Sequence, residues 1–93
     1  MQGYDLFNNY PNPFNPSTSI RFSIPERSGV KIRVFNSLGE EIITLINNAL
    51  ERGVHSIAWN GMDKNNLSVP SGVYFITMEA KYFRKTIKSV LIK

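Results

Sequence analysis

The sequence predicts an all-β fold, an antiparallel β-sandwich of six to seven strands. Short segments alternate apolar and polar residues with the period of two that is typical of half-buried strands. Turn residues separate these segments, and Asn60-Gly61 is the strongest hairpin signal among them. No segment shows the 3.6-residue apolar spacing of a long amphipathic helix.

Length and composition indicate one folded domain over residues 1–93. Hydrophobic residues make up 42% of the chain and charged residues 19%, which is typical of globular rather than disordered proteins. We divide the chain into an extended Pro/Asn-rich arm, residues 1–17, and a β-sandwich, residues 18–93. The arm has the character of a linker that follows an upstream domain.

The arm contains the segment Tyr-Pro-Asn-Pro-Phe-Asn-Pro at residues 10–16. Its three prolines fix φ and remove three main-chain donors, which disfavours both a helix and a central strand. We therefore expect an extended, polyproline-like course along the surface. Phe14 is the large apolar side chain of this segment, and we expect it to pack onto the core.

The first two strands follow the arm. The segment Ile-Arg-Phe-Ser-Ile alternates within residues 18–25, and Val-Lys-Ile-Arg-Val alternates at residues 30–34. Residues 25–29 form the turn between them. Residues 36–39 supply a hairpin loop, in which Gly39 can take a positive φ.

Two further strands are expected in the middle of the chain. Residues 41–46 are rich in β-branched side chains and predict the third strand. Residues 47–52 are polar, and we expect an irregular segment there, with a short helical turn as an alternative. The fourth strand places His55, Ile57 and Trp59 on one face.

The last two strands are expected at residues 72–80 and 83–93, joined by a tight connection at Lys81-Tyr82. A longer loop at residues 62–71 precedes them, and either this loop or the arm is the candidate for a seventh strand. Apolar residues at inward positions are expected to share one core: Ile20, Phe22, Ile32, Val34, Leu45, Ile57, Trp59, Tyr74 and Ile76.

The formal net charge is +4, and basic residues gather late in the chain. A solvated strand face explains them better than a nucleic-acid site, because the neighbouring aromatic residues Tyr82 and Phe83 lie at a turn instead of forming a stacking platform. No apolar run approaches the roughly 20 residues of a membrane-spanning helix. We expect neither nucleic-acid binding nor a transmembrane segment.

The residue types needed for catalysis are scarce. The chain has no cysteine, and its single histidine, His55, excludes a site with two histidine ligands. His55 is best interpreted as a rim residue that hydrogen-bonds a loop. No nucleophile elbow or carboxylate pair is evident, so we expect a protein that is not an enzyme and needs no cofactor.

One loop resembles a calcium-binding segment in part. Asp63 and Asn65 supply oxygen side chains at the first and third positions, but Ser68 and Tyr74 occupy the places where an EF-hand needs glycine and glutamate. Side-chain oxygens that stabilise a turn are the simpler interpretation. A loose single-calcium loop stays open as an alternative.

A family resemblance follows from motifs in a fixed order. The string Asn9-Tyr10-Pro11-Asn12-Pro13-Phe14-Asn15-Pro16 opens it, and Val34-Phe35-Asn36-Ser37-Leu38-Gly39 continues it. The later motifs are Gly53-Val54-His55, Trp59-Asn60-Gly61-Met62-Asp63, Ser71-Gly72-Val73-Tyr74 and the basic-apolar terminus through Lys93. Together they resemble the type A C-terminal sorting domain of the type IX (Por) secretion system. The related immunoglobulin-like domain of flagellar hook-capping proteins shares the middle motifs without the Pro-Asn-Pro-Phe opening.

The resemblance implies an immunoglobulin-like fold and a role in secretion from a Gram-negative bacterium. Such a domain sits at the C-terminus of a larger cargo protein and is recognised by the outer-membrane secretion machinery after transit through the periplasm. A sortase-like peptidase often removes it, and the cargo is then anchored to the cell surface or released.

The resemblance also selects candidate recognition residues. They are Pro11, Asn12, Pro13, Phe14, Gly72, Tyr74, Lys85, Lys88, Val90, Leu91, Ile92 and Lys93. The end of the last strand, residues 90–93, is expected to present an open edge to which a receptor strand could add. Its lysines equally fit protection of that edge against aggregation.

Two other functions stay open at this point. A carbohydrate-binding or adhesive module would need Trp59, Tyr74 or Tyr82 to line an exposed groove. A structural immunoglobulin-like spacer next to a secreted enzyme would need no site.

Overall fold

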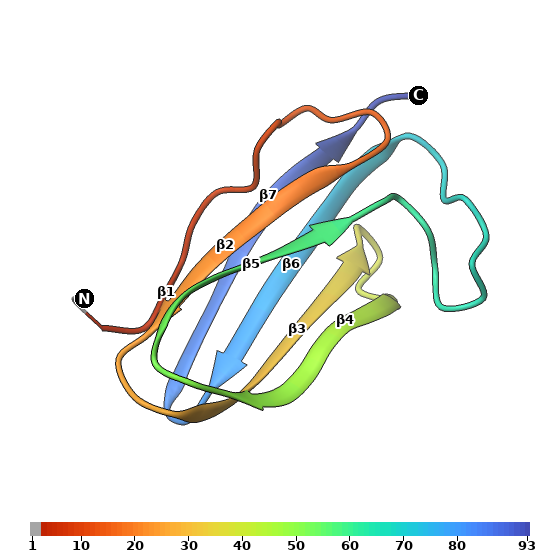
Figure 1. Ribbon diagram of the computed structural model, residues 1–93. Helices are drawn as coiled ribbons and strands as arrows, with labels where there is room; N and C mark the ends of the chain where they lie inside the picture. Colours follow the sequence, from red (N-terminus) through yellow and green to blue (C-terminus); the bar gives the residue numbers. More distant parts are fainter. Residues whose placement is uncertain (1–2) are drawn as a thin grey trace.

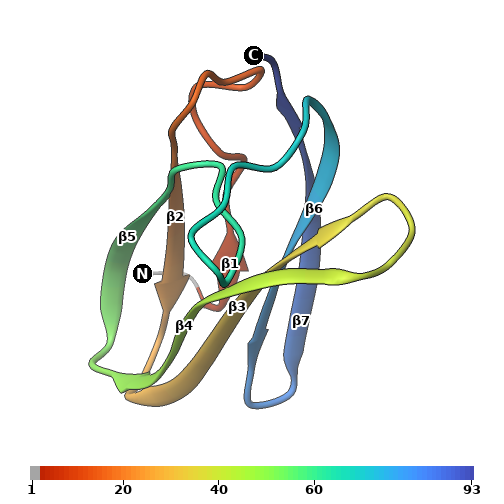
Figure 2. The same ribbon diagram turned by 90° about the vertical axis from the view of Figure 1, so that its right-hand side faces the viewer.

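Seven strands and no helix make up residues 3–93, the part of the chain that this computed structural model describes (Figure 1). The strands are β1 (Asp5–Leu6), β2 (Thr18–Ile24), β3 (Ser28–Asn36), β4 (Glu41–Leu50), β5 (Gly53–Trp59), β6 (Gly72–Ala80) and β7 (Phe83–Leu91). One sheet has the order β1-β2-β5 and the other the order β4-β3-β6-β7. All strand pairs are antiparallel. The predicted antiparallel β-sandwich is therefore confirmed, and its two layers face each other in Figure 2.

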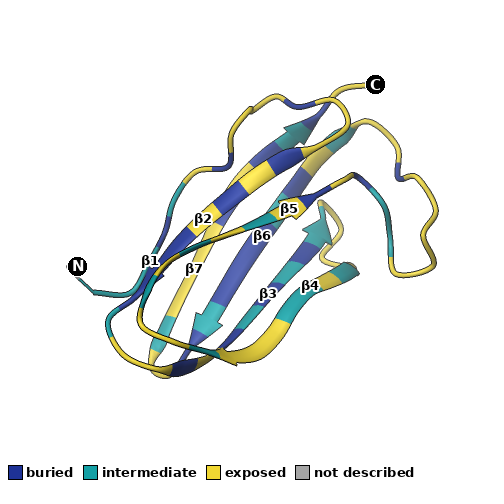
Figure 3. Cartoon of the chain, viewed as in Figure 1, coloured by how far each residue is buried: buried dark blue, intermediate teal, exposed yellow. Residues whose placement is uncertain are grey.

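The core lies between the two sheets, where the alternation of apolar residues predicted it (Figure 3). Seven of the nine predicted core residues are buried, with Trp59 only 1% exposed. The other two, Leu45 and Ile57, are half-buried and pack against the same cluster. Leu6, Ile24, Met78 and Leu91 join this core as well.

The seventh strand comes from the N-terminal segment. β1 pairs with β2 through Asp5↔Ser23 and Leu6↔Phe22, so one of the two predicted sources of an extra strand is confirmed. Leu6 is fully buried, which explains why two residues suffice to hold β1 on the sheet. Residues 1 and 2, where the predicted arm begins, lie outside the described residues.

The third strand is longer than its sequence indicated. Residues 47–50 continue β4 and pair with β3, so the prediction of an irregular segment over residues 47–52 was wrong. The polar side chains there point to solvent from an edge strand, where main-chain pairing does not require apolar residues. Register shifts leave Ile42 and Leu45 without a partner on β3, which makes β4 a doubly bulged edge.

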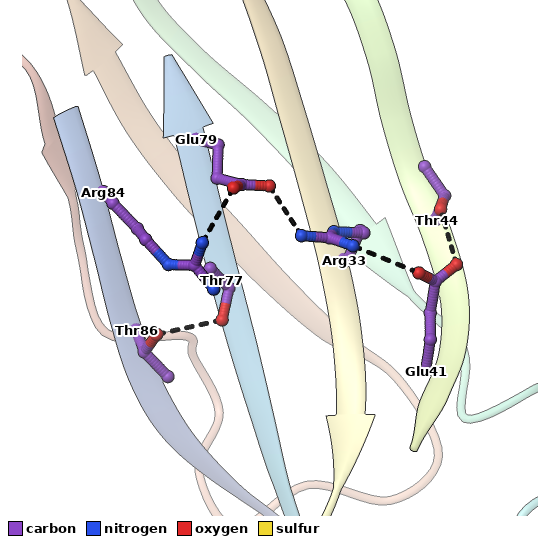
Figure 4. A network of polar contacts seen from close by, with 7 residues as sticks. All are labelled: Arg33, Glu41, Thr44, Thr77, Glu79, Arg84 and Thr86. Carbon is purple, nitrogen blue, oxygen red and sulfur yellow. Dashed lines mark hydrogen bonds and ion pairs between the residues drawn. The ribbon is translucent and has the colours of Figure 1, made fainter. Parts of the chain in front are cut away.

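A polar network connects the outer faces of all four strands in the larger sheet (Figure 4). Arg33 lies at its centre, with Nη2 2.7 Å from Glu79 and Nη1 3.3 Å from Glu41. A hydrogen bond from Thr44 and the Arg33 guanidinium both lower the pKa of Glu41. Glu79 also accepts from Arg84 at 2.9 Å, which links β6 to β7. These pairs are charge-assisted and cross-strand, so they hold the outer face in one register.

Candidate functional site

The arm lies against the terminal strand β7. Tyr10 bridges Ser19 on β2, and Phe14 forms a parallel bridge with Leu91 at the end of β7. The chain bends at residues 11–13 and again at residues 15–16, so the continuous polyproline-like course predicted from the prolines is wrong. The peptide bonds before Pro11, Pro13 and Pro16 are cis.

Phe14 attaches the arm by both side chain and main chain. Its ring is 2% exposed and lies 5.4 Å from the Trp59 ring, centroid to centroid, which confirms the expected packing onto the core. Its N–H donates to the Val90 carbonyl, and its own carbonyl accepts from the Ile92 N–H, both at 2.9 Å. The arm therefore acts as a short additional strand beside the end of β7.

Asn12 extends this pairing with its side chain. Its amide Nδ2 donates to the Lys88 carbonyl at 3.2 Å, and Oδ1 accepts from the Val90 N–H at 3.0 Å. A side-chain amide carries one donor group and one acceptor, so it can replace a peptide group at a strand edge. Asn12 is suited to this position because aspartate could not donate to the carbonyl.

Asn9 joins the arm to both sheets from inside the molecule. Only 3% of it is exposed, and its Nδ2 lies 2.9 Å from Thr18 Oγ1, 3.0 Å from Ser89 Oγ and 3.3 Å from the Pro11 carbonyl. Ser89 is completely buried. Neither Asn9 nor Ser89 was selected from the sequence. Their sequence signal was weak, because a single asparagine or serine is found on the surface more often than in the interior.

Replacing Asn12 with alanine is expected to loosen the end of β7. The change removes two hydrogen bonds to main-chain groups and should lower the free energy of unfolding by about 1 kcal/mol. The amide of Val90 should then exchange with solvent faster, which hydrogen-exchange NMR measures directly. Asn15→Ala is the matched control, since Asn15 is an exposed asparagine of the same arm. Equal exchange of Val90 in both variants would contradict the assigned role of Asn12.

The contacts of Asn12 and Phe14 cover the end of β7, which the sequence analysis expected to be an open edge. The N–H and C=O of Val90, the C=O of Lys88 and the N–H of Ile92 are all bonded to Asn12 or Phe14. A receptor strand could therefore add at residues 90–92 only after the arm leaves. The expectation of a free edge at this end was wrong, because the arm lies too far away in sequence for the pairing to be read from local pattern.

The other recognition candidates fall into buried and exposed groups. Tyr74 is 4% exposed, donates to the Pro70 carbonyl at 2.6 Å and has its pKa raised by burial. Leu91 is also buried, so it and Tyr74 serve the core. Gly72 pairs with Leu91 and takes φ +155°. The exposed candidates are Pro11, Pro13, Lys85, Lys88, Ile92 and Lys93.

The exposed lysines have different surroundings. Lys85 lies 2.8 Å from the Asp5 carboxylate, and this hydrogen bond together with one from the Leu6 N–H lowers the pKa of Asp5. Lys93 rests on the loop before β6, where its N–H donates to Ser71 Oγ at 2.9 Å and its ammonium contacts Ser68. For Lys88, residues 3–93 supply no acidic partner.

Three other sequence interpretations can be checked against the fold. His55 stacks on Phe22, and its Nε2 lies 2.7 Å from the Glu51 carbonyl, as expected of a rim histidine next to a loop. Asp63 Oδ1 accepts from the N–H groups of Asn65 and Leu67, which is the expected side-chain-stabilised turn. Trp59 and Tyr74 are buried, so neither can line a sugar-binding groove.

The described residues hold neither a metal-binding cluster nor a membrane-spanning helix. Residues 3–93 contain no cluster of three or more histidine, cysteine or acidic side chains that could hold a metal ion. Across the same residues, no helix is long and apolar enough to cross a membrane.

Comparison with known proteins points to one family. A family model described as the FlgD Ig-like domain matches residues 12–82. No curated protein sequence matches the chain.

Two solved structures from Porphyromonas gingivalis have a similar fold. One is PorZ, described as an essential bacterial surface component of the type-IX secretion system, with a TM-score of 0.64 and 20% identity. The other is dimeric latent PorU, with a TM-score of 0.73 and 15% identity. The matches cover 98% and 96% of this chain, but only 12% of PorZ and 9% of PorU.

Proposed function

Because this chain belongs to the FlgD Ig-like domain family, we propose that it is a type A C-terminal sorting domain of the type IX secretion system. In this role it directs an attached cargo protein from the periplasm across the outer membrane and has no catalytic activity of its own. Its partners are the outer-membrane secretion machinery and a sortase-like peptidase that removes it. The cargo then reaches the cell surface or the medium.

The observation that carries this proposal is where the family match ends. The matched residues 12–82 leave out residues 3–11 and the whole of β7. In the structure these two unmatched segments contact each other in register: Tyr4 stacks on Phe83 at 5.8 Å, Asp5 pairs with Lys85, and Asn9 bonds Ser89. The two ends of the chain, which lie outside the family match, thus form one element, and the opening Asn-Pro motif and the basic-apolar terminus lie within and beside it.

The comparison structures also support a role in type IX secretion. PorZ, which carries a similarly folded segment, is a surface component of the type-IX secretion system. The carbohydrate-binding alternative is weakened, because two of the three aromatic residues it requires on the surface, Trp59 and Tyr74, are buried in the core. The structural spacer is the alternative that the export experiment must exclude.

The domain is expected to export a reporter. A periplasm-targeted fluorescent protein fused to the N-terminal side of this chain should reach the surface or medium of a bacterium with type IX machinery. Cell fractionation and surface proteolysis measure the exported fraction. The matched controls are the reporter without the domain and the same fusion in a strain without the machinery, and both should stay in the periplasm.

Deletion of residues 90–93 is not a clean test of the signal. It removes buried Leu91 and the main-chain partners of Phe14, so unfolding would imitate lost recognition. The intact domain gives the decisive result. A folded fusion that stays in the periplasm of the competent strain would exclude the sorting role and favour a structural spacer.

A further inference from the structure

The middle of β7 has outward main-chain groups that the arm does not bond, although Asp5 and Asn9 of the arm contact the side chains of Lys85 and Ser89. Main-chain groups of Lys88, Val90 and Ile92 bond the arm, so they point away from β6. Because these groups alternate along a strand, Arg84 and Thr86 direct theirs the same way. No main-chain bond from residues 3–93 reaches the outward groups of Arg84 and Thr86 or the Lys88 N–H. The open edge thus consists of residues 84–88.

This edge already accepts an added strand at its far end. Phe14 bridges Leu91 in parallel, and Asn12 continues the row of hydrogen bonds as far as the Lys88 carbonyl. The residues before it, 84–88, pair with β6 without a register shift. At the opposite edge of the same sheet, β4 carries two bulges that disturb the row of main-chain groups. β7 is consequently the edge at which this sheet can grow.

The charges along the open edge are positive. Arg84, Lys85 and Lys88 are all exposed, as is Thr86 between them. Arg84 and Lys85 each have one acidic neighbour, whereas Lys88 has none among the described residues. Two copies pairing antiparallel about Thr86 would place Arg84 of one opposite Lys88 of the other. Such like-charge contacts oppose self-association and favour an acidic partner.

We propose that residues 84–88 of β7 bind an extended, acidic segment of a partner protein by β-strand addition. The outward N–H and C=O groups of Thr86 supply the central hydrogen bonds, and the acidic side chains of the partner face Arg84 and Lys88. This inference rests on the proposed sorting function, since it assigns the acidic segment to the secretion machinery. It moves the recognition surface from the covered end of β7 to its middle.

Proline at position 86 tests the main-chain part of the proposal. Because the Thr86 N–H points outward, Thr86→Pro blocks the added strand without removing a bond to β6. The change also removes a hydroxyl contact, Thr86 Oγ1 to Thr77 Oγ1 at 2.9 Å. The exported fraction of the reporter fusion should fall about tenfold, the effect of one lost hydrogen bond at the contact.

Ser56→Pro is a closely matched control on the other sheet. On β2, the main-chain groups of Arg21 point toward Phe7 and therefore away from β5. Since Ser56 lies opposite Arg21 in this antiparallel pair, its N–H points away from β2, outward from the edge strand β5. Its hydroxyl makes an equivalent contact, 2.9 Å to Ser19 Oγ. This variant should keep full export, and circular dichroism melting shows whether both proline variants are folded.

Charge reversal gives a second and independent test. Lys88→Glu should reduce export about tenfold through repulsion of the acidic segment, whereas Lys64→Glu, an equal change in an exposed loop, should not. The edge inference is overturned if the wild-type domain exports the reporter and folded Thr86→Pro, or Lys88→Glu, exports it equally well. The sorting function would still stand in that case. Failure of the wild-type domain to export overturns both, because the inference rests on that function.

Discussion

Replacing Trp59 with alanine should lower the free energy of unfolding by about 3–5 kcal/mol. The indole is 1% exposed and lies between two other rings, with centroids 5.4 Å from Phe14 and 5.3 Å from Tyr74. Its Nε1–H donates to the Met62 carbonyl at 3.0 Å, so alanine would leave both a cavity and an acceptor without its donor.

The expected loss is large compared with the stability of the domain. A chain of this length has a free energy of unfolding of about 5–9 kcal/mol, so Trp59→Ala should remove at least about a third of it. Urea denaturation followed by circular dichroism measures the loss. Trp59→Phe keeps a ring in the core and gives up the hydrogen bond, so it should cost clearly less. Equal midpoints for the two variants would show that packing around the indole contributes little.

Phe14→Ala should release the arm and cost about 3–5 kcal/mol. The substitution empties a core position next to Trp59, and the bonds from Phe14 to Val90 and Ile92 then lose the side chain that holds them in place. Hydrogen exchange at Ile92 should accelerate more than in the centre of β3.

Phe7→Ala is the matched control for Phe14. Phe7 belongs to the same N-terminal segment but is half-buried on the outer face, where the Arg21 guanidinium lies 5.4 Å from its ring centroid. It should cost no more than about 1 kcal/mol. If both alanine variants lose the same stability and keep Ile92 protected, Phe14 does not attach the arm.

Strands with one buried face could be predicted from the sequence. Apolar and polar residues alternate regularly over residues 19–24 and 30–34, and the inward residues Ile20, Phe22, Ile32 and Val34 are all fully buried. β4 could be predicted only in part, because its two bulges turn neighbouring residues such as Ile42 and Ile43 toward the same core. A bulge changes which face a side chain takes, and no local residue pattern announces it.

The candidate site was harder to predict, since it depends on contacts between distant parts of the chain. The prolines correctly indicated a segment that is neither helix nor central strand. They could not show that Asn12 bonds main-chain groups of β7, 76 and 78 residues away, or that Asn9 reaches Ser89, 80 residues away. Those contacts decide which part of the β7 edge is free, so the open part of this edge could not be located from sequence alone.

The parallel course of the arm and β7 also bears on how the domain responds to mechanical force. From Tyr4–Phe83 through Asn9–Ser89 to Phe14–Leu91, the two segments run side by side in the same direction. Tension between an N-terminal attachment and the C-terminus would therefore pull them past each other and load their contacts together. If the two segments were instead pulled apart from one end, at right angles to their length, the same contacts would break one at a time. A domain drawn outward by its C-terminal end would for this reason resist extension until the Phe14 contact gives way.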